Sequence, residues 1–94
     1  MSSYLAIRWS HDFVDDPELI LVEIDDRRKE VRKIEYFRDG RIGVATRSVE
    51  TELTGLSDCA VPVIEEINLD PQFSANEIPA DDFSKAWEEA VIEC

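Results

Sequence analysis

The fold is decided by residues 30–49, EVRKIEYFRDGRIGVATRSV, in which two strand-like segments flank Asp39-Gly40. An Asp-Gly pair between such segments is a signature of a β-hairpin, because a type I′ turn needs positive φ at both central residues. We therefore predict antiparallel strands over 30–38 and 41–49.

A two-residue loop would also determine which residues face each other across the hairpin. The predicted pairs are Phe37 with Ile42, Tyr36 with Gly43, Glu35 with Val44, Ile34 with Ala45, and Arg32 with Arg47. Two arginines placed directly opposite each other are unfavourable unless an anion neutralises them. We expect that anion to be an Asp or Glu from the acidic half of the chain. A bound phosphate or nucleic-acid backbone is the alternative.

Two further strands are expected before the hairpin. Residues 4–11 alternate between apolar and polar positions, as a half-buried strand does. Residues 18–24 are apolar on both faces, which is typical of a central strand covered on one side by a helix. The intervening 12–17 is predicted to be a loop and 25–28 a polar turn, because both are rich in turn-forming residues.

The last third of the chain is predicted to be mainly helical. Residues 62–67 can form a short helix with proline in its first turn, ending near Asp70-Pro71. Apolar residues then recur at helical spacing, and this stripe consists of Phe83, Ala86, Trp87, Ala90, Val91 and Cys94. Turn-forming residues interrupt any period over 50–61, so a loop is expected there.

Together these elements predict an α+β fold, with a four-stranded, mainly antiparallel sheet and the C-terminal helix packed on one face. A chain of 94 residues is expected to form a single domain, residues 1–94. Phe83 and Trp87 should press on the sheet. The candidate contacts are Ile7, Trp9, Ile20, Val22 or Ile34.

Acidic residues are concentrated in the second half of the chain. Residues 51–94 hold eleven Asp and Glu against one basic residue, Lys85, and the net charge of the chain is −12. Such a field attracts basic partners and repels nucleic acid and anionic membranes. The longest apolar run, 19–22, is far shorter than the roughly 18 residues of a membrane span. We therefore expect neither a nucleic-acid nor a membrane partner.

The sequence carries no recognisable catalytic, cofactor-binding or metal-binding motif, so we predict a protein that is not an enzyme and needs no cofactor. His11 precedes Asp12, but neighbouring side chains of a strand point to opposite faces, and a structural hydrogen bond is the expected role. One histidine and two distant cysteines match no zinc spacing. The acidic residues of 12–18 lack the spacing and glycine of an EF-hand, so a solvated loop is expected.

The cysteines and the N-terminal residues both give information on the cellular compartment of the protein. Cys59 and Cys94 are expected to be reduced thiols rather than a disulfide. The first residues lack the positively charged start and apolar stretch of a secretory signal. A cytoplasmic location is expected.

Several motifs are distributed over nearly the whole chain. They are Trp9-Ser10-His11-Asp12-Phe13 with Asp15-Asp16-Pro17, Glu30 to Glu35 with Phe37 to Gly43, and Pro62 to Ile67 with Asp70 to Phe73, Phe83 and Trp87. This set resembles a family of small bacterial proteins known only as a domain of unknown function. The resemblance implies a bacterial source and one compact domain, and it brings no established catalytic residues.

Small acidic α+β proteins of this kind are also similar in general character to immunity proteins, which block the active sites of contact-dependent or polymorphic toxins. Toxin domains that cut nucleic acid are usually basic, so an acidic inhibitor can occupy the cleft where phosphates would lie. Our leading hypothesis is an inhibitor of such a basic toxin domain. The expected partner-binding residues are Glu65, Glu66, Asp70, Glu77, Asp81, Asp82, Glu88 and Glu89.

Three other functions stay open. The first is a non-catalytic interaction or regulatory module, which could form a homodimer through an exposed edge strand. The second is a small-molecule-binding domain or enzyme, which would need His11, Asp12 and the Arg32/Arg47 pair together in one pocket. The third is a mimic of nucleic acid whose carboxylates imitate a phosphate ladder.

Overall fold

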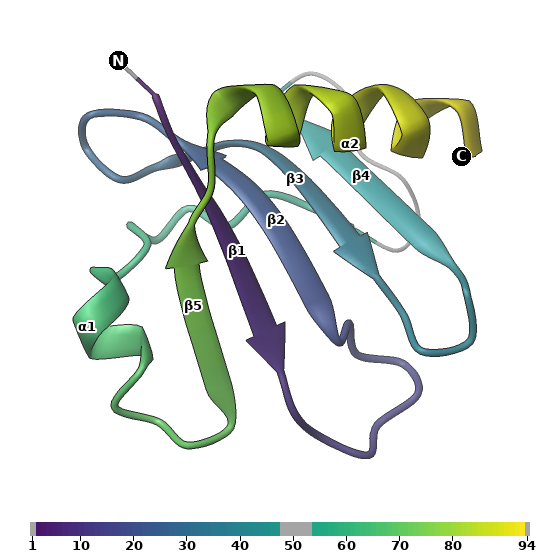
Figure 1. Ribbon diagram of the computed structural model, residues 1–94, viewed down its shortest axis with the longest axis horizontal. Coiled ribbons are helices and arrows are strands. Elements are labelled where there is room, and N and C mark those ends of the chain that lie inside the picture. Colours follow the sequence, from purple (N-terminus) through teal and green to yellow (C-terminus); the bar gives the residue numbers. More distant parts are fainter. Residues whose placement is uncertain (1, 48–53, 94) are drawn as a thin grey trace.

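The computed structural model describes residues 2–47 and 54–93, which form one sheet and two helices (Figure 1). The strands are β1 (Ser3–Trp9), β2 (Leu19–Ile24), β3 (Glu30–Tyr36), β4 (Ile42–Thr46) and β5 (Phe73–Glu77), and the helices are α1 (Ile64–Ile67) and α2 (Ala80–Glu93). Parts of three predictions lie outside the described residues: the strand end at 48–49, the loop at 50–53 and Cys94 in the last helix.

The sheet has five strands in the order β4-β3-β2-β1-β5, and adjacent strands pair antiparallel. The α+β class is confirmed, and β2 occupies the central position that its apolar sequence predicts. The predicted number of strands is wrong, because the sequence pattern does not predict β5. Its five residues carry one short alternation, Phe73 and Ala75 against polar neighbours, and their partner strand β1 lies far away in the sequence.

The predicted hairpin is present, but its turn and register are wrong. Gly40 has a φ of +94°, whereas the only non-glycine with positive φ in the described part of the chain is Arg28, so Asp39 does not adopt a type I′ conformation. Gly40 N donates to Phe37 O at 3.0 Å and Phe37 N donates to Arg41 O at 2.9 Å, which closes a loop of residues 38–40. A loop longer by one residue shifts every pair. The observed pairs are Arg32 with Thr46, Lys33 with Ala45, Ile34 with Val44, Glu35 with Gly43, and Tyr36 with Ile42.

Helix α2 covers one face of the sheet. Phe83 and Ala90 of α2 are buried against Ile34 and Val44, and Leu21 packs on the same cluster. Figure 1 shows α2 lying across the sheet, with α1 well apart from it beside β5. Of the predicted contacts for Phe83 and Trp87, Ile34 is confirmed.

The other predicted contacts, Ile7, Trp9, Ile20 and Val22, are wrong because these residues face away from α2. Successive residues of a strand alternate between faces, so Ile20 and Val22 lie opposite to Leu21. On their face Leu5, Val22, Ile24 and Val61 form a second buried cluster, onto which Ile64 and Ile67 of α1 pack. The two helices therefore lie on opposite sides of the sheet.

Arg32 of β3 forms an ion pair with Glu23 of β2 and places its guanidinium against two aromatic rings of α2. Arg32 Nε donates to Glu23 Oε1 at 2.6 Å, and the guanidinium lies 5.0 Å from the ring centre of Phe83 and 5.1 Å from that of Trp87. Burial alone raises the pKa of Glu23, but hydrogen bonds from Ser2 and Arg32 outweigh burial and hold that pKa below its usual value. Arg32 thus has an intramolecular carboxylate partner.

The source of the neutralising carboxylates differs from the prediction. Arg32 pairs with Glu23, and Arg47 pairs with Asp25 at 3.1 Å, so both carboxylates come from the first half of the chain. The two arginines are not opposite each other, since Thr46 faces Arg32. No bound anion is needed to explain either arginine.

Residues 54–62, here called the strap, run across the face opposite to α2 and are fastened by polar residues of the β2–β3 turn and of β3. The fastening bonds run from Arg28 Nε to Val61 O at 2.6 Å, from Arg28 Nη2 to Pro62 O at 2.7 Å, from Lys29 Nζ to Asp58 O, from Lys33 Nζ to Gly55 O at 3.1 Å, and from Ser57 N to Glu30 Oε1 at 2.6 Å. Much of the positive charge of this region therefore holds the backbone of the strap.

Replacing Phe83 by Ala should lower the free energy of unfolding by about 3–5 kcal/mol, because the ring is fully buried and leaves a cavity. Urea denaturation followed by far-UV circular dichroism measures this change. Phe13→Ala is the matched control: its ring is 65% exposed and its loss should cost less than about 0.5 kcal/mol. Equal losses for the two variants would contradict the packing described for α2.

Replacing Glu23 by Gln should lower the free energy of unfolding at pH 7 by about 1–3 kcal/mol, because Arg32 loses its charged partner. The folded-state pKa of Glu23 is depressed, so its stabilising contribution is fully present above the unfolded-state pKa of about 4.3 and is lost as the pH falls through the lower folded-state pKa. The difference between the urea midpoints of the two proteins should therefore shrink as the pH falls from 7 to 3. A difference that stays constant from pH 7 to pH 3 would show that ionisation of Glu23 is irrelevant.

Candidate functional site

The eight predicted partner-binding residues are all exposed, and the sheet divides them into two groups of four. Glu65 and Glu66 lie on α1, Asp70 follows it, and Glu77 of β5 is opposite Leu5 on the α1 side of the sheet. These four are called the α1 group. The other four, Asp81, Asp82, Glu88 and Glu89, lie on α2 and are called the α2 group. The structure brings the members of each group to one side, but it does not bring the two groups together.

No member of either group forms an ion pair with a described residue. The ion pairs found within 2–47 and 54–93 join Arg32 to Glu23, Lys33 to Glu30, Arg41 to Asp15 and Asp39, and Arg47 to Asp25. All of these residues belong to the first half of the chain. The basic residues of the hairpin therefore leave the carboxylates of both groups unneutralised.

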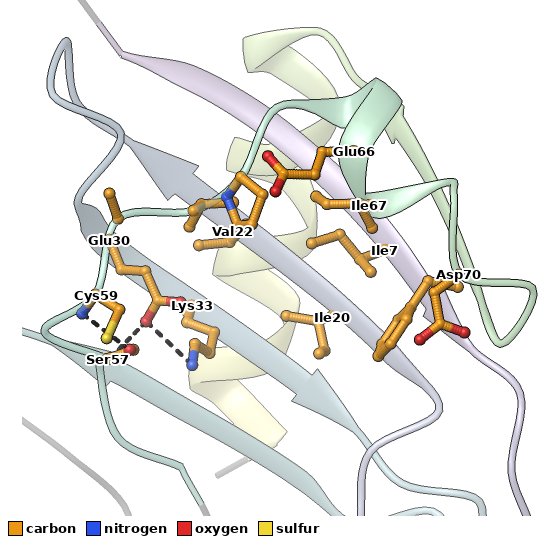
Figure 2. Close-up of a pocket in the computed structure, with 14 residues that line it drawn as sticks. Ile7, Ile20, Val22, Glu30, Lys33, Ser57, Cys59, Glu66, Ile67 and Asp70 are labelled. Carbon is orange, nitrogen blue, oxygen red and sulfur yellow. Dashed lines mark hydrogen bonds and ion pairs between the residues drawn. The ribbon is translucent and has the colours of Figure 1, made fainter.

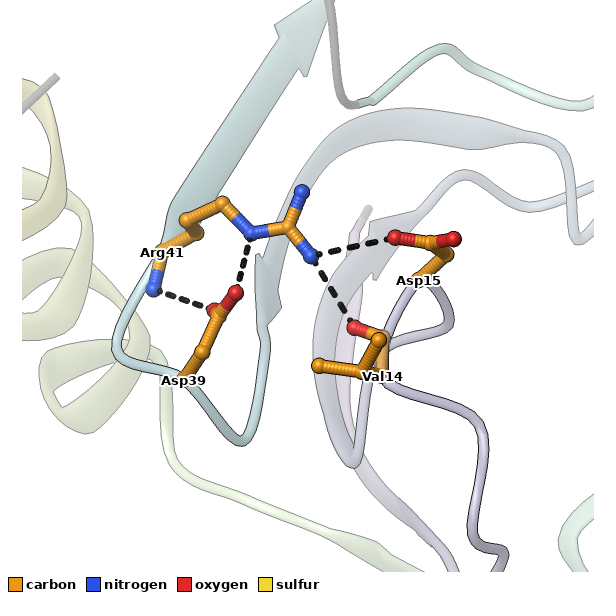
Figure 3. Close-up of polar contacts among 4 residues, drawn as sticks. All are labelled: Val14, Asp15, Asp39 and Arg41. Carbon is orange, nitrogen blue, oxygen red and sulfur yellow. Dashed lines mark hydrogen bonds and ion pairs between the residues drawn. The ribbon is translucent and has the colours of Figure 1, made fainter.

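Arg41 is an example of a cation that is neutralised by carboxylates from the first half of the chain (Figure 3). Its Nε donates to Asp39 Oδ2 at 2.7 Å, and its Nη2 donates to Val14 O at 3.0 Å and lies 3.5 Å from Asp15 Oδ1. Hydrogen bonds from the Arg41 side chain and backbone hold the pKa of Asp39 below its usual value. The hairpin turn is thereby tied to the loop between β1 and β2.

His11 has the structural role that the sequence suggests. Its Nε2 lies 2.8 Å from Pro17 O, and its Nδ1 accepts a hydrogen bond from Phe13 N at 2.9 Å. Both ring nitrogens therefore hold the β1–β2 loop. Arg32 is engaged under α2 and Arg47 with Asp25, so the structure does not gather His11 and the two arginines into one pocket.

A cavity of about 510 Å³ lies on the sheet face opposite to α2 (Figure 2), and we call it the groove. Its floor consists of Ile7, Ile20 and Val22 from β1 and β2. Its walls come from the strap, α1 and β5, and the main apolar wall residues are Val61, Pro62, Ile67 and Phe73. The groove is therefore an apolar hollow that the strap and α1 cover only in part.

The two ends of the groove differ in polarity. At one end Lys33 Nζ lies 3.1 Å from Glu30 Oε1, which also accepts a hydrogen bond from Ser57 N at 2.6 Å. Asp70 borders the other end, and Glu66 lies on the wall between the two ends, near Ile67 (Figure 2). Asp70 Oδ1 accepts from Gln72 N at 2.9 Å, whereas the carboxylate of Glu66 has no hydrogen-bond partner among the residues described. Away from Lys33, the groove thus carries uncompensated negative charge.

Glu35 lies on the same face as the groove, opposite Ile20 in the pairing of β2 with β3. Burial raises the pKa of its carboxyl group, and the nearby charge of Lys33 only partly opposes this effect. The fold therefore favours the protonated form of Glu35 more than water does.

Sequence reasoning missed the groove, although one signal was available. Residues 18–24 are apolar on both faces, and a single helix can cover one face of a strand only. Ile20 and Val22 therefore required a second cover. What the sequence did not reveal is that β5, the strap and α1 provide that cover incompletely.

Two features of metal-binding and membrane proteins are missing from the part of the chain that the structure describes. Within 2–47 and 54–93, no group of three or more His, Cys, Asp and Glu side chains is placed to share a metal ion. No helix of the described chain has the length and apolar character of a membrane span. Cys59 is exposed and forms no disulfide with a described residue.

A five-stranded antiparallel sheet with a long helix on one face and a strapped groove on the other defines a small α+β protein. The chain belongs to the family described as Domain of unknown function (DUF6881), which matches residues 3–92. No curated protein and no solved structure matches the chain. The motif-based resemblance to a family of unknown function is thereby confirmed.

Replacing Glu35 by Gln should stabilise the protein slightly at pH 7, because an amide removes a charge that burial disfavours, although partial exposure to solvent screens that charge. Because the folded-state pKa of Glu35 is raised, protonation of Glu35 contributes its full stabilisation of the fold below the unfolded-state pKa of about 4.3. This stabilisation is lost as the pH rises through the folded-state pKa. The gain should therefore vanish at about pH 4.

Urea midpoints from pH 4 to pH 8 test this pH dependence of the Glu35→Gln variant. Glu88→Gln, on the exposed side of α2, controls for the general effect of removing one negative charge. A Glu35→Gln variant that is less stable than the parent at pH 7 would contradict the burial of this carboxyl group.

Proposed function

We propose that this chain is a non-catalytic binding protein of the immunity type, which captures a basic partner protein through its exposed carboxylates. A toxin domain that cuts nucleic acid is the kind of partner that this charge fits. One observation carries the proposal: the α1 and α2 groups make no ion pair with the described residues, while the hairpin cations are held by first-half carboxylates and by the strap. An uncompensated negative field of this kind speeds association with a cationic surface.

The α1 side is the better candidate for the docking face. Stable interfaces combine an apolar centre with a polar rim. Glu66 and Asp70 border the groove, and Leu69 beside them is 81% exposed. Of the α2 group, Glu89 lines a smaller hollow of about 400 Å³ near the end of α2. Carboxylates and a broad apolar floor thus coincide on the α1 side.

Self-association through β5 has less support. The side chain of Asn68 donates to Ala75 O at 3.1 Å and accepts from Ala75 N at 2.6 Å, as a neighbouring strand would. This occupies the outer edge of β5 at its midpoint and blocks the pairing that an edge-to-edge dimer requires. A different protein is therefore a better partner for the α1 side than a second copy joined at β5.

The double change Glu65→Lys and Glu66→Lys should slow association with the protein encoded by the neighbouring gene, since immunity proteins sit beside the toxins that they block. Reversed charge at the docking face should lower the association rate about tenfold at low salt, and raising the salt concentration should lower the parent rate by a similar factor. Stopped-flow fluorescence measures both rates.

Glu88→Lys with Glu89→Lys is the matched control, because it makes the same change in net charge on the other side of the sheet. It should slow association less than about threefold. A larger effect of this control would show that the docking face is on the α2 side. Absence of a complex at every salt concentration would refute the proposed function.

A further inference from the structure

We propose that the groove receives one large apolar side chain of the partner, flanked in the partner's own sequence by Lys or Arg residues that pair with Glu66 and Asp70. The inference rests on the proposed function, because it states how the captured protein is held. It adds a specific chemistry to the docking face: an apolar anchor between two positive charges.

The floor of the groove is the first support. Leu5 is 2% exposed because α1 and the strap cover it, whereas Ile7 and Ile20 on the same face stay only partly buried. Cavities of about 300–1,000 Å³ with mainly apolar linings are typical binding sites, and the groove measures about 510 Å³. Large apolar or aromatic anchors that fill such pockets supply most of the energy of protein interfaces.

The distribution of charge decides which groups should flank the anchor. The ammonium group of Lys33 is already held by Glu30 and by Gly55 O, each at 3.1 Å, so it is poorly placed to bind an anionic ligand. Away from Lys33, Glu66 on the wall and Asp70 at the opposite end have no cation among the described residues. Charge complementarity therefore favours positive ligand groups beside Glu66 and Asp70.

The walls of the groove are fastened before any partner arrives. Arg28 holds the carbonyl oxygens of Val61 and Pro62, and Asn68 ties the end of α1 to Ala75 of β5. A site whose backbone is already fixed loses less conformational entropy on binding. The groove can therefore accept an anchor without rearrangement of the sheet.

Three tripeptides test the inference with the intact chain: acetyl-Lys-Trp-Lys-amide, acetyl-Lys-Ala-Lys-amide and acetyl-Glu-Trp-Glu-amide. Methyl resonances of Ile7, Ile20 and Ile67 report on the groove, and that of Ile92, which is 82% exposed on α2, reports on unspecific charge attraction. Only the Lys-Trp-Lys peptide should shift the groove methyls saturably, with an affinity at least about tenfold above those of the other two.

Two variants complete the test. Ala60→Trp should fill the groove and abolish the shifts, with Ala60→Ser as its control. The double variant Glu66→Gln with Asp70→Asn keeps the shape of the groove. It should weaken binding of the Lys-Trp-Lys peptide several-fold without strengthening binding of the Glu-Trp-Glu peptide. The inference therefore stays testable if the tryptophan variant does not fold.

The outcomes separate this inference from the proposed function. Equal binding of the Glu-Trp-Glu peptide, larger shifts at Ile92 than in the groove, or unchanged binding by Ala60→Trp would overturn the groove assignment, even if the neighbouring gene product forms a complex. Binding of the Lys-Trp-Lys peptide without any protein complex would support the groove chemistry and refute the capture of that protein.

Discussion

The structure depends on the contact that Arg32 makes between the sheet and α2. Its guanidinium pairs with Glu23 at 2.6 Å and lies about 5 Å from the rings of Phe83 and Trp87. A cation held against aromatic faces and a carboxylate at a partly dry interface gains more than the same contacts would in water. This contact and the burial of Phe83 and Ala90 hold α2 on one face of the sheet, and the strap and α1 cover part of the other face.

The covering of one face by α2 and of the other by the strap and α1 explains where the unpaired carboxylates of the molecule lie. The cations of the turn before β3 and of β3 itself, such as Arg28 and Lys33, bind carbonyl groups of the strap and carboxylates of the first half. They are therefore not available to the acidic second half, and residues such as Glu66 and Glu88 face solvent without a described cation. The same bonds hold the strap only partly over the sheet, so an apolar groove lies beside unneutralised carboxylates.

Local patterns predicted the hairpin strands, α2 and the short helix α1, because each is encoded by residues close together in the sequence. The predicted register of the hairpin is wrong because an Asp-Gly pair allows more than one turn geometry. In this turn Gly40 has a positive φ and Asp39 does not. Strand β5 failed for a different reason. Its pairing with β1 depends on distant residues, and five residues carry too little alternation to indicate a strand.

By itself, the sequence determined the α+β class, the central position of β2, the amphipathic face of α2 and the excess of negative charge, because periodicity and composition are local or additive properties. Only the tertiary structure decided which carboxylates lie together and which apolar residues stay uncovered. Both depend on the faces to which strands direct alternate side chains and on long-range pairing. A shift of one residue, as at Gly40, changes every cross-strand neighbour while the composition stays the same.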